Sequence, residues 1–333
     1  MICQIKKWRI TLLVCLGFSL MNGQEVYPGK AKKVEANISD EFSFESKYID
    51  IGAEKIHYVE SGEGDPVLLL HGLPSWSYLW RNVIPEIDSN KQVIALDFLG
   101  FGKSSFPKDR NVSVEAQYKM LTDFIEAKQL KNVTLFVQDI GSLVGMLYVM
   151  RQPDNVKAIA LFEAPFMPAD YFYNQFPLTM KLFTKLISRP QRAERWMVKK
   201  NFAGKNLAVN FFTGRKLSKE IKDNYTKPWD EKERRYAMVN GPDPGSLPKN
   251  KGKGDSDFEQ LLNTIAEGMK KTETPILYFY AKRGLINQKE AVEYARENFK
   301  NYTEVYLGKG KHFLTESHPK QMGEEFNKWY ENL

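Results

Sequence analysis

Residues 135–145 read LFVQDIGSLVG, and this stretch decides both the fold and the chemistry of the chain. An apolar run ends at Asp139, small residues follow, and a helix-forming run continues to Met150. This order is typical of a nucleophile elbow, a sharp turn that holds a reactive side chain between a strand and a helix. An aspartate that only caps the N-terminus of a helix gives the same pattern, so the turn alone leaves both interpretations open.

An aspartate at the apex of such a turn favours displacement at saturated carbon. The carboxylate of Asp139 would attack an sp³ carbon and leave an alkyl–enzyme ester, which water must then hydrolyse. A serine in the same place would instead indicate cleavage of esters or peptides. The residue type at position 139 therefore predicts the kind of reaction before any partner is considered.

The first 23 residues are typical of a secretory signal peptide. Lys6, Lys7 and Arg9 form a basic start, and an uncharged apolar run follows from Ile10 to Leu20. We expect residues 1–23 to be removed, the mature protein to be secreted or periplasmic, and no stable membrane insertion afterwards.

Composition excludes several classes of function. Both cysteines, Cys3 and Cys15, lie in the leader, so the mature chain has neither a disulfide nor a cysteine-based metal site. The basic residues are spread along the chain without interleaved aromatic residues, which argues against nucleic-acid binding. We expect no metal and no cofactor. The chain has 333 residues, of which 42% are hydrophobic, enough for one large or two small domains.

The order of elements predicts a core in two pieces. From residue 45 short apolar strands alternate with amphipathic helices, which is typical of an α/β sheet with crossover helices. The alternation stops at residues 167–265, which are helix-like, rich in aromatic residues and without a convincing parallel strand. We therefore predict core segments 45–166 and 266–333, with a helical cap over the carboxyl ends of the strands.

A base for Asp139 can come from only four histidines. His312 directly follows the last predicted strand, the late position that the base takes in the order nucleophile, acid, histidine. His57 lies inside a strand and His318 at a helix start, so we expect structural roles for both. His71 opens a His-Gly-x-Pro turn and is expected to brace the loop that supplies backbone donors.

Beside Asp139 and His312, a third catalytic residue should be a carboxylate that orients the imidazole. The first strand after the predicted cap is followed by a loop, residues 281–287, that contains no acid. The next acid along the chain is Glu290. Glu163 instead closes the apolar strand 156–162, which we expect beside the elbow strand. A surface or helix-capping acid would fit the same place, but we predict that Glu163 orients His312.

Five segments of the sequence together form a recognisable pattern. They are HGLPSWSYLWR (71–81), LDFLGFGKS (96–104), VQDIGS (137–142), FEAPFMP (162–168) and GKHFLTES (310–317). Together they resemble the haloalkane dehalogenases, over about residues 45 to 332, in the branch with an Asp–His–Glu triad that also includes the coelenterazine luciferases. The resemblance implies an α/β-hydrolase fold with a mostly parallel eight-stranded sheet and a helical cap after the sixth strand. It further implies a monomer that acts on a small apolar substrate.

Two positions depart from the family pattern. In that family, an asparagine after His-Gly and a tryptophan after the nucleophile donate side-chain N–H groups to the leaving halide. Here these positions hold Leu73 and Ile140, whose backbone N–H groups alone can form an oxyanion hole. We expect slow carbon–halogen cleavage unless Trp76, Trp196 or Trp229 lines the pocket and supplies a donor.

Two other functions fit the sequence, one that uses the same aspartate as the nucleophile and one that is not hydrolytic. An epoxide hydrolase needs no halide donors, because tyrosines of the cap protonate the epoxide oxygen. A luciferase-like oxygenase, or an inactive relative that only binds a ligand, is the third alternative. Candidate acids for the epoxide alternative are Tyr171, Tyr173, Tyr225 and Tyr236.

Overall fold

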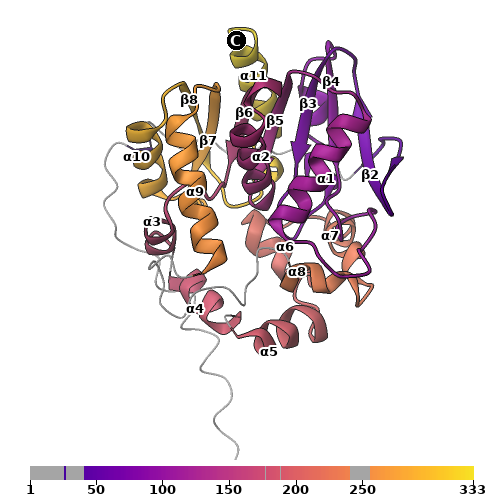
Figure 1. Ribbon diagram of the computed structural model, residues 1–333. Helices are drawn as coiled ribbons and strands as arrows, with labels where there is room; N and C mark the ends of the chain where they lie inside the picture. The colour runs from indigo at the N-terminus through magenta and orange to yellow at the C-terminus, as the bar shows by residue number, and fades with distance from the viewer. Residues whose placement is uncertain (1–25, 28–40, 177, 188, 241–255) are drawn as a thin grey trace, which may run out of the picture.

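The computed structural model describes residues 26–27, 41–176, 178–187, 189–240 and 256–333 (Figure 1). The expected signal peptide lies outside these residues. Eight strands are described, and they form one sheet. The strands are β1 (Lys47–Ile51), β2 (Glu54–Ser61), β3 (Asp65–Leu70), β4 (Lys91–Leu96), β5 (Val133–Gln138), β6 (Val156–Phe162), β7 (Ile276–Lys282) and β8 (Tyr302–Lys309).

The sheet is mostly parallel, as predicted. The strand order is β1-β2-β4-β3-β5-β6-β7-β8, in which β1 pairs antiparallel with β2 and β2 with β4. All other pairs are parallel. The elbow strand β5 lies in the middle, between β3 and β6, so the loops after these three strands meet at one edge of the sheet.

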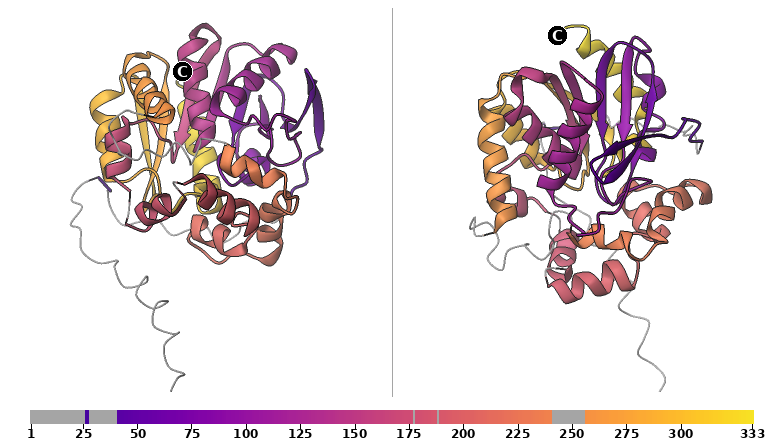
Figure 2. Two further views of the ribbon diagram at one scale, coloured as in Figure 1. Left: turned by 60° about the horizontal axis from the view of Figure 1, so that its bottom comes forward. Right: turned by 45° about the vertical axis from the view of Figure 1, so that its right-hand side comes forward.

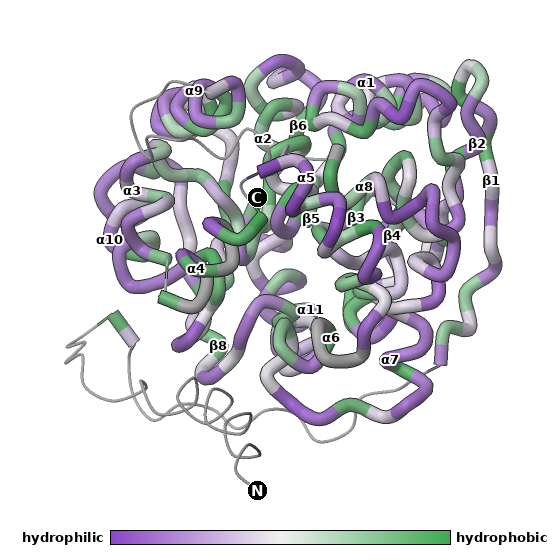
Figure 3. The backbone as a smooth tube through the Cα atoms, turned by 90° about the horizontal axis from the view of Figure 1, so that it is seen from below, coloured by the Kyte–Doolittle hydropathy of each residue, from purple (hydrophilic) through white to green (hydrophobic). Residues whose placement is uncertain are grey.

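Both faces of the sheet are buried, because alternate side chains of a strand point to opposite sides. In β3, Leu68 and Leu70 join the core on one face, and Val67 and Leu69 join the core on the other. Helices on the first face include α1 (Val114–Ala127), α2 (Ile140–Arg151), α9 (Asp257–Lys271) and α10 (Lys289–Asn298), whereas α11 (Pro319–Tyr330) covers the second (Figure 2). Hydrophobic residues gather in the interior around α2 and β6 (Figure 3).

Local sequence explains where helix α1 begins and which face it buries. The side chain of Ser113 caps the helix by accepting the backbone N–H of Ala116. Met120, Leu121 and Phe124 are buried one helical turn further along, on the side that faces the sheet.

A helical insertion follows the sixth strand, again as predicted. Its helices lie below the sheet in Figure 1. The boundary that we expected at residue 265 falls inside α9, which packs against α2 and therefore belongs with the core. No helix of the described residues is long and apolar enough to cross a membrane. The inserted helices are α3 (Ala169–Asn174), α4 (Leu178–Ile187), α5 (Pro190–Ala193), α6 (Asn206–Thr213), α7 (Lys219–Thr226) and α8 (Ala237–Asn240), with short turns η4 (Glu194–Lys199), η5 (Lys227–Trp229) and η6 (Arg234–Tyr236).

A tyrosine of the insertion is hydrogen-bonded to a buried ion pair of the core. Arg81 binds Glu316 through two hydrogen bonds, Nη1 to Oε1 at 2.5 Å and Nη2 to Oε2 at 3.0 Å, and both side chains are 0% exposed. The hydroxyl of Tyr225, on α7, donates to the same Oε1 at 2.5 Å. Because burying two charges is costly unless each is fully paired, removing one partner should be far worse than removing both.

We therefore expect Arg81→Met to lower the free energy of unfolding by about 3–5 kcal/mol, since it leaves the Glu316 carboxylate buried without its cation. Urea denaturation followed by circular dichroism measures this change. The double variant Arg81→Met/Glu316→Leu is the control and should recover most of the loss. A single variant that loses less than about 1 kcal/mol would show that the pair does not hold these segments together.

Candidate active site

Asp139 occupies a sharp turn between β5 and α2. Its φ of 53° lies in a region that residues other than glycine rarely adopt. The turn is possible because small residues follow it. A Cβ added at Gly141 would collide with the carbonyl oxygens of Leu70 and His71, and one at Gly145 would lie 2.8 Å from a methyl group of Val137. The geometry is that of the predicted elbow, and not of an aspartate that caps a helix, because the side chain makes no capping hydrogen bond.

Two backbone N–H groups point at the Asp139 carboxylate. The N–H of Leu73 donates to Oδ1 at 2.8 Å, and the N–H of Ile140 is also hydrogen-bonded to this group. These are the two donors that we expected in an oxyanion hole. Burial raises the pKa of the Asp139 carboxyl, and His312 and the two N–H groups offset only part of this rise. The side chain is still 18% exposed, so a substrate can reach it.

His312 and Glu163 lie beside this carboxylate. His312 Nδ1 is 3.0 Å from Glu163 Oε2, and its Nε2 is 3.7 Å from Asp139 Oδ2. The backbone N–H groups of residues 285–287 also donate to the Glu163 carboxylate, at 2.8 to 3.2 Å, and fix its orientation. Glu290, the alternative acid, is exposed on the first turn of α10.

The surroundings of His312 favour its charged form. Burial lowers the pKa of the imidazole, but the hydrogen bond to Glu163 and the negative charge of Asp139 outweigh this, so the pKa is raised overall. On the cap side, the carbonyl oxygen of Phe212 accepts the backbone N–H of His312 at 3.0 Å. The insertion therefore helps to hold the loop that carries the histidine.

The remaining histidines hold loops together. His71 accepts the backbone N–H of Phe98 on Nε2 at 3.1 Å, and its Nδ1 lies 3.1 Å from the carbonyl oxygen of the next residue. Burial lowers the pKa of His71, which keeps it neutral. His57 contacts Asp97 at 2.7 Å, and His318 is buried beside the hydroxyl of the preceding serine.

One residue of the site was not predicted from the sequence. Gln138, the last residue of β5, is buried, and its Nε2 lies 2.8 Å from His312 Nε2. A polar residue at the end of an otherwise apolar strand, directly before the nucleophile, was the available signal.

The three tryptophans proposed for the pocket differ in what their indoles contact. The N–H of Trp76 donates to the carbonyl oxygen of Asn224 at 3.0 Å, so it is occupied. Trp196 is half-buried, with Lys200 Nζ 4.2 Å from the centre of its ring. Trp229 is 1% exposed, and its N–H has no partner among the described residues.

The four tyrosines considered for an epoxide hydrolase are separated. The hydroxyl of Tyr225 is bound to Glu316, Tyr171 is 54% exposed, and the guanidinium of an arginine lies 4.5 Å from the Tyr236 ring. Tyr173 is buried, and its hydroxyl has no partner in the part of the chain that the structure describes.

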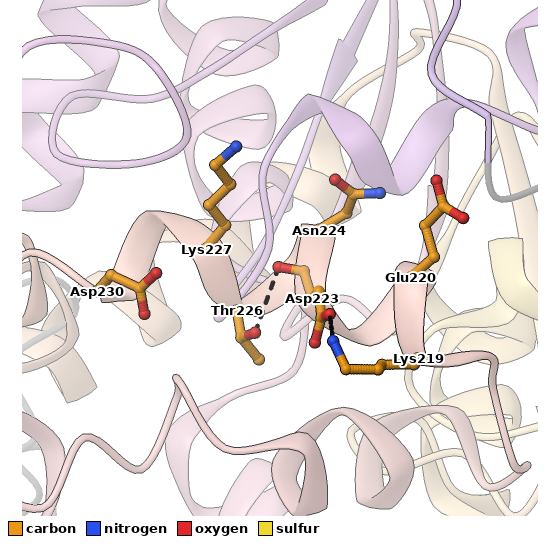
Figure 4. Close-up of a pocket in the computed structure, with 7 residues that line it drawn as sticks. All are labelled: Lys219, Glu220, Asp223, Asn224, Thr226, Lys227 and Asp230. Carbon is orange, nitrogen blue, oxygen red and sulfur yellow. Dashed lines mark hydrogen bonds and ion pairs between the residues drawn. The ribbon is translucent and has the colours of Figure 1, made fainter.

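A large surface hollow lies along α7, away from the triad (Figure 4). Its volume is about 620 Å³, and charged side chains line it, with an ion pair between Lys219 and Asp223. Such a lining suits water rather than a small apolar substrate. The lining residues are Lys219, Glu220, Asp223, Asn224, Thr226, Lys227 and Asp230.

Comparison with known proteins agrees with the fold. The family described as alpha/beta hydrolase fold matches residues 65–193. A haloalkane dehalogenase of Agrobacterium fabrum is 28% identical over 83% of this chain and 88% of that protein. One of Mycolicibacterium paratuberculosis is 36% identical, but over only 39% of this chain and 46% of that protein.

Solved structures of haloalkane dehalogenases superpose on most of the chain. The enzyme DatA from Agrobacterium tumefaciens has a TM-score of 0.77 at 26% identity, covering 86% of this chain and 95% of that one. An ancestral haloalkane dehalogenase has a TM-score of 0.77 at 27% identity, covering 85% and 97%. Together with the sheet and the elbow, these matches make this chain a haloalkane dehalogenase-like α/β-hydrolase.

Proposed function

We propose that the protein hydrolyses a small apolar substrate through an alkyl–enzyme ester on Asp139. One observation carries this proposal. The Asp139 carboxylate has two backbone donors on one side and an imidazole on the other, and a buried carboxylate orients that imidazole. This arrangement supplies a nucleophile, an oxyanion hole and a base for water.

In the first step, Asp139 Oδ2 attacks a saturated carbon of the substrate. Oδ1 accepts the N–H of Leu73, whereas Oδ2 lies toward His312 and is free to form the bond. The bond from carbon to the leaving group breaks as the new carbon–oxygen bond forms, and the leaving group takes the electron pair. The product is the Asp139 alkyl ester, which is neutral.

In the second step, water attacks the ester carbonyl carbon, Cγ of Asp139. His312 Nε2 takes a proton from this water, and Glu163 stabilises the imidazolium through Nδ1. The negative charge that develops on Oδ1 is stabilised by the N–H groups of Leu73 and Ile140. The ester bond then breaks, the alcohol leaves with the proton from His312, and Asp139, left as a carboxylic acid, releases the second proton of the water to solvent to restore its carboxylate.

The observations favour two different leaving groups, a halide and an epoxide oxygen. The relatives named haloalkane dehalogenase favour a halide. Leu73 and Ile140 offer no side-chain donor to a halide, which favours an epoxide, whose oxygen stays on the product and needs a proton instead.

We expect Asp139→Asn to abolish turnover and His312→Ala to accumulate the ester, because the base acts only in the second step. Intact-mass spectrometry of His312→Ala after incubation with bromoalkanes or epoxides measures the adduct, and peptide mapping assigns it to residue 139. His318→Ala is the matched control and should show none. Wild-type turnover without an adduct in His312→Ala would refute a nucleophilic Asp139, and the absence of turnover on both panels would favour a binding protein.

A donor placed at position 73 should increase dehalogenation. One donor in a preorganised site contributes about 2.7–4 kcal/mol, and 1.36 kcal/mol is a factor of ten. Allowing for imperfect fit, we expect Leu73→Asn to raise the rate of bromide release by at least about tenfold. Leu73→Val, which changes the same position but adds no donor, is the control. Ile140 is 1% exposed, so a tryptophan there would overpack the core. Equal rates for the two variants would place the leaving group elsewhere.

The charge of Glu163 should set the pKa of His312. Because a nearby carboxylate stabilises the imidazolium, Glu163→Gln should lower the pKa of His312, by about 1 or more. With four histidines in the chain, a ¹H–¹⁵N NMR titration can follow each imidazole separately. Glu290→Gln is the control and should leave this pKa unchanged. A fall in the Glu290→Gln variant alone would show that the wrong acid has been assigned.

A further inference from the structure

The amide of Gln138 occupies the face of His312 that must accept a proton from water. Gln138 is 0% exposed, and its Nε2 lies 2.8 Å from His312 Nε2 although the two residues are 174 positions apart. Its Oε1 has no hydrogen-bond partner among the described residues. A Cβ added at Gly72 would collide with this Oε1 and with Asp139, so the glycine leaves room for the amide.

The hydrogen-bonding capacity of each group fixes the direction of this contact. The carboxylate of Glu163 accepts, so the proton of neutral His312 lies on Nδ1, 3.0 Å from Glu163 Oε2. Nε2 then offers a lone pair, and the amide nitrogen of Gln138 can only donate. The bond therefore runs from Gln138 N–H to His312 Nε2, and it exists only while His312 is neutral.

We propose that Gln138 is a positioning residue that opposes the protonation of His312 by donating its amide N–H to the lone pair on Nε2. Its meaning for catalysis rests on the proposed function, whereas its effect on His312 does not. Two charged groups face the imidazole, Glu163 from the end of β6 and Asp139 from the turn after β5. From the cap, the uncharged ring of Phe212 packs 5.5 Å away.

These contacts have opposite effects on the protonation of His312. Both carboxylates favour the imidazolium, which cannot act as a base, and Gln138 N–H favours the neutral ring, which can. In the alkyl–enzyme the charge of Asp139 is gone, so one of the two carboxylates no longer opposes Gln138. Because Nε2 has a single lone pair, it accepts the proton of water only after that water has taken the place of the Gln138 N–H.

The test is an NMR titration of the histidines in Gln138→Met, which keeps the length of the side chain and removes the donor. We expect the pKa of His312 to rise by about 0.5 to 1, the effect of one ordinary hydrogen bond on a protonation equilibrium. Gln138→Leu is a second variant in case the first does not fold. The matched control is Thr134→Val, because Thr134 is buried in the same strand and its hydroxyl has no described partner.

Two results would contradict the proposal, and each says something different about the amide of Gln138. A lower pKa would mean that the amide oxygen faces an imidazolium N–H, and an unchanged pKa would mean that the contact does not affect the proton; either result overturns the proposal. This measurement needs no substrate, so it stands even if no adduct forms on Asp139. Where an adduct does form, single-turnover kinetics should show ester hydrolysis slowed about tenfold in Gln138→Met, with ester formation within twofold of the wild type.

Discussion

The backbone turn at Asp139 is the constraint on which the rest of the site depends. A residue with a side chain costs about 1–3 kcal/mol in such a conformation, so the surrounding structure must hold it there. The central position of β5 does this, since β3 and β6 fix the strand on both sides. The backbone N–H of Asp139 donates to the carbonyl oxygen of Glu163 at 3.1 Å, which ties the nucleophile directly to the strand that carries the acid. Gly72 and Gly141 keep the space above the turn open for close backbone contacts.

The proposed reaction needs a charged Asp139 and a neutral His312, and the first condition works against the second. In the proposed reaction Asp139 must be charged to attack, and its charge together with that of Glu163 favours the imidazolium form of His312. The same histidine must be neutral to accept a proton from water. A hydrogen bond from a neutral donor, such as the amide of Gln138, can oppose two carboxylates without adding a charge to a buried site, where a third charge would be costly to desolvate.

The insertion contributes to the site from outside the sheet. It supplies a carbonyl oxygen, that of Phe212, to the loop of His312, and it is fixed to the core by the Tyr225 hydroxyl on Glu316. Both contacts lie within the segment that follows β8, so movement of the cap would be transmitted to the base. Cap position and base position are therefore coupled in this fold through a few buried polar contacts.

Sequence by itself determined the elements whose signals are local. Asp139 and Glu163 directly follow apolar strands, His312 lies in the loop after the last strand, and parallel strands bring such positions to one edge of a sheet. Only the tertiary structure decided which side chains from distant segments meet. The amide of Gln138 reaches His312, and the Trp76 indole is bound to a cap carbonyl, because the fold places these groups within hydrogen-bond distance. The end of the cap was misplaced for the same reason: an amphipathic helix such as α9 has the same pattern whether its apolar face packs on a cap or on a core.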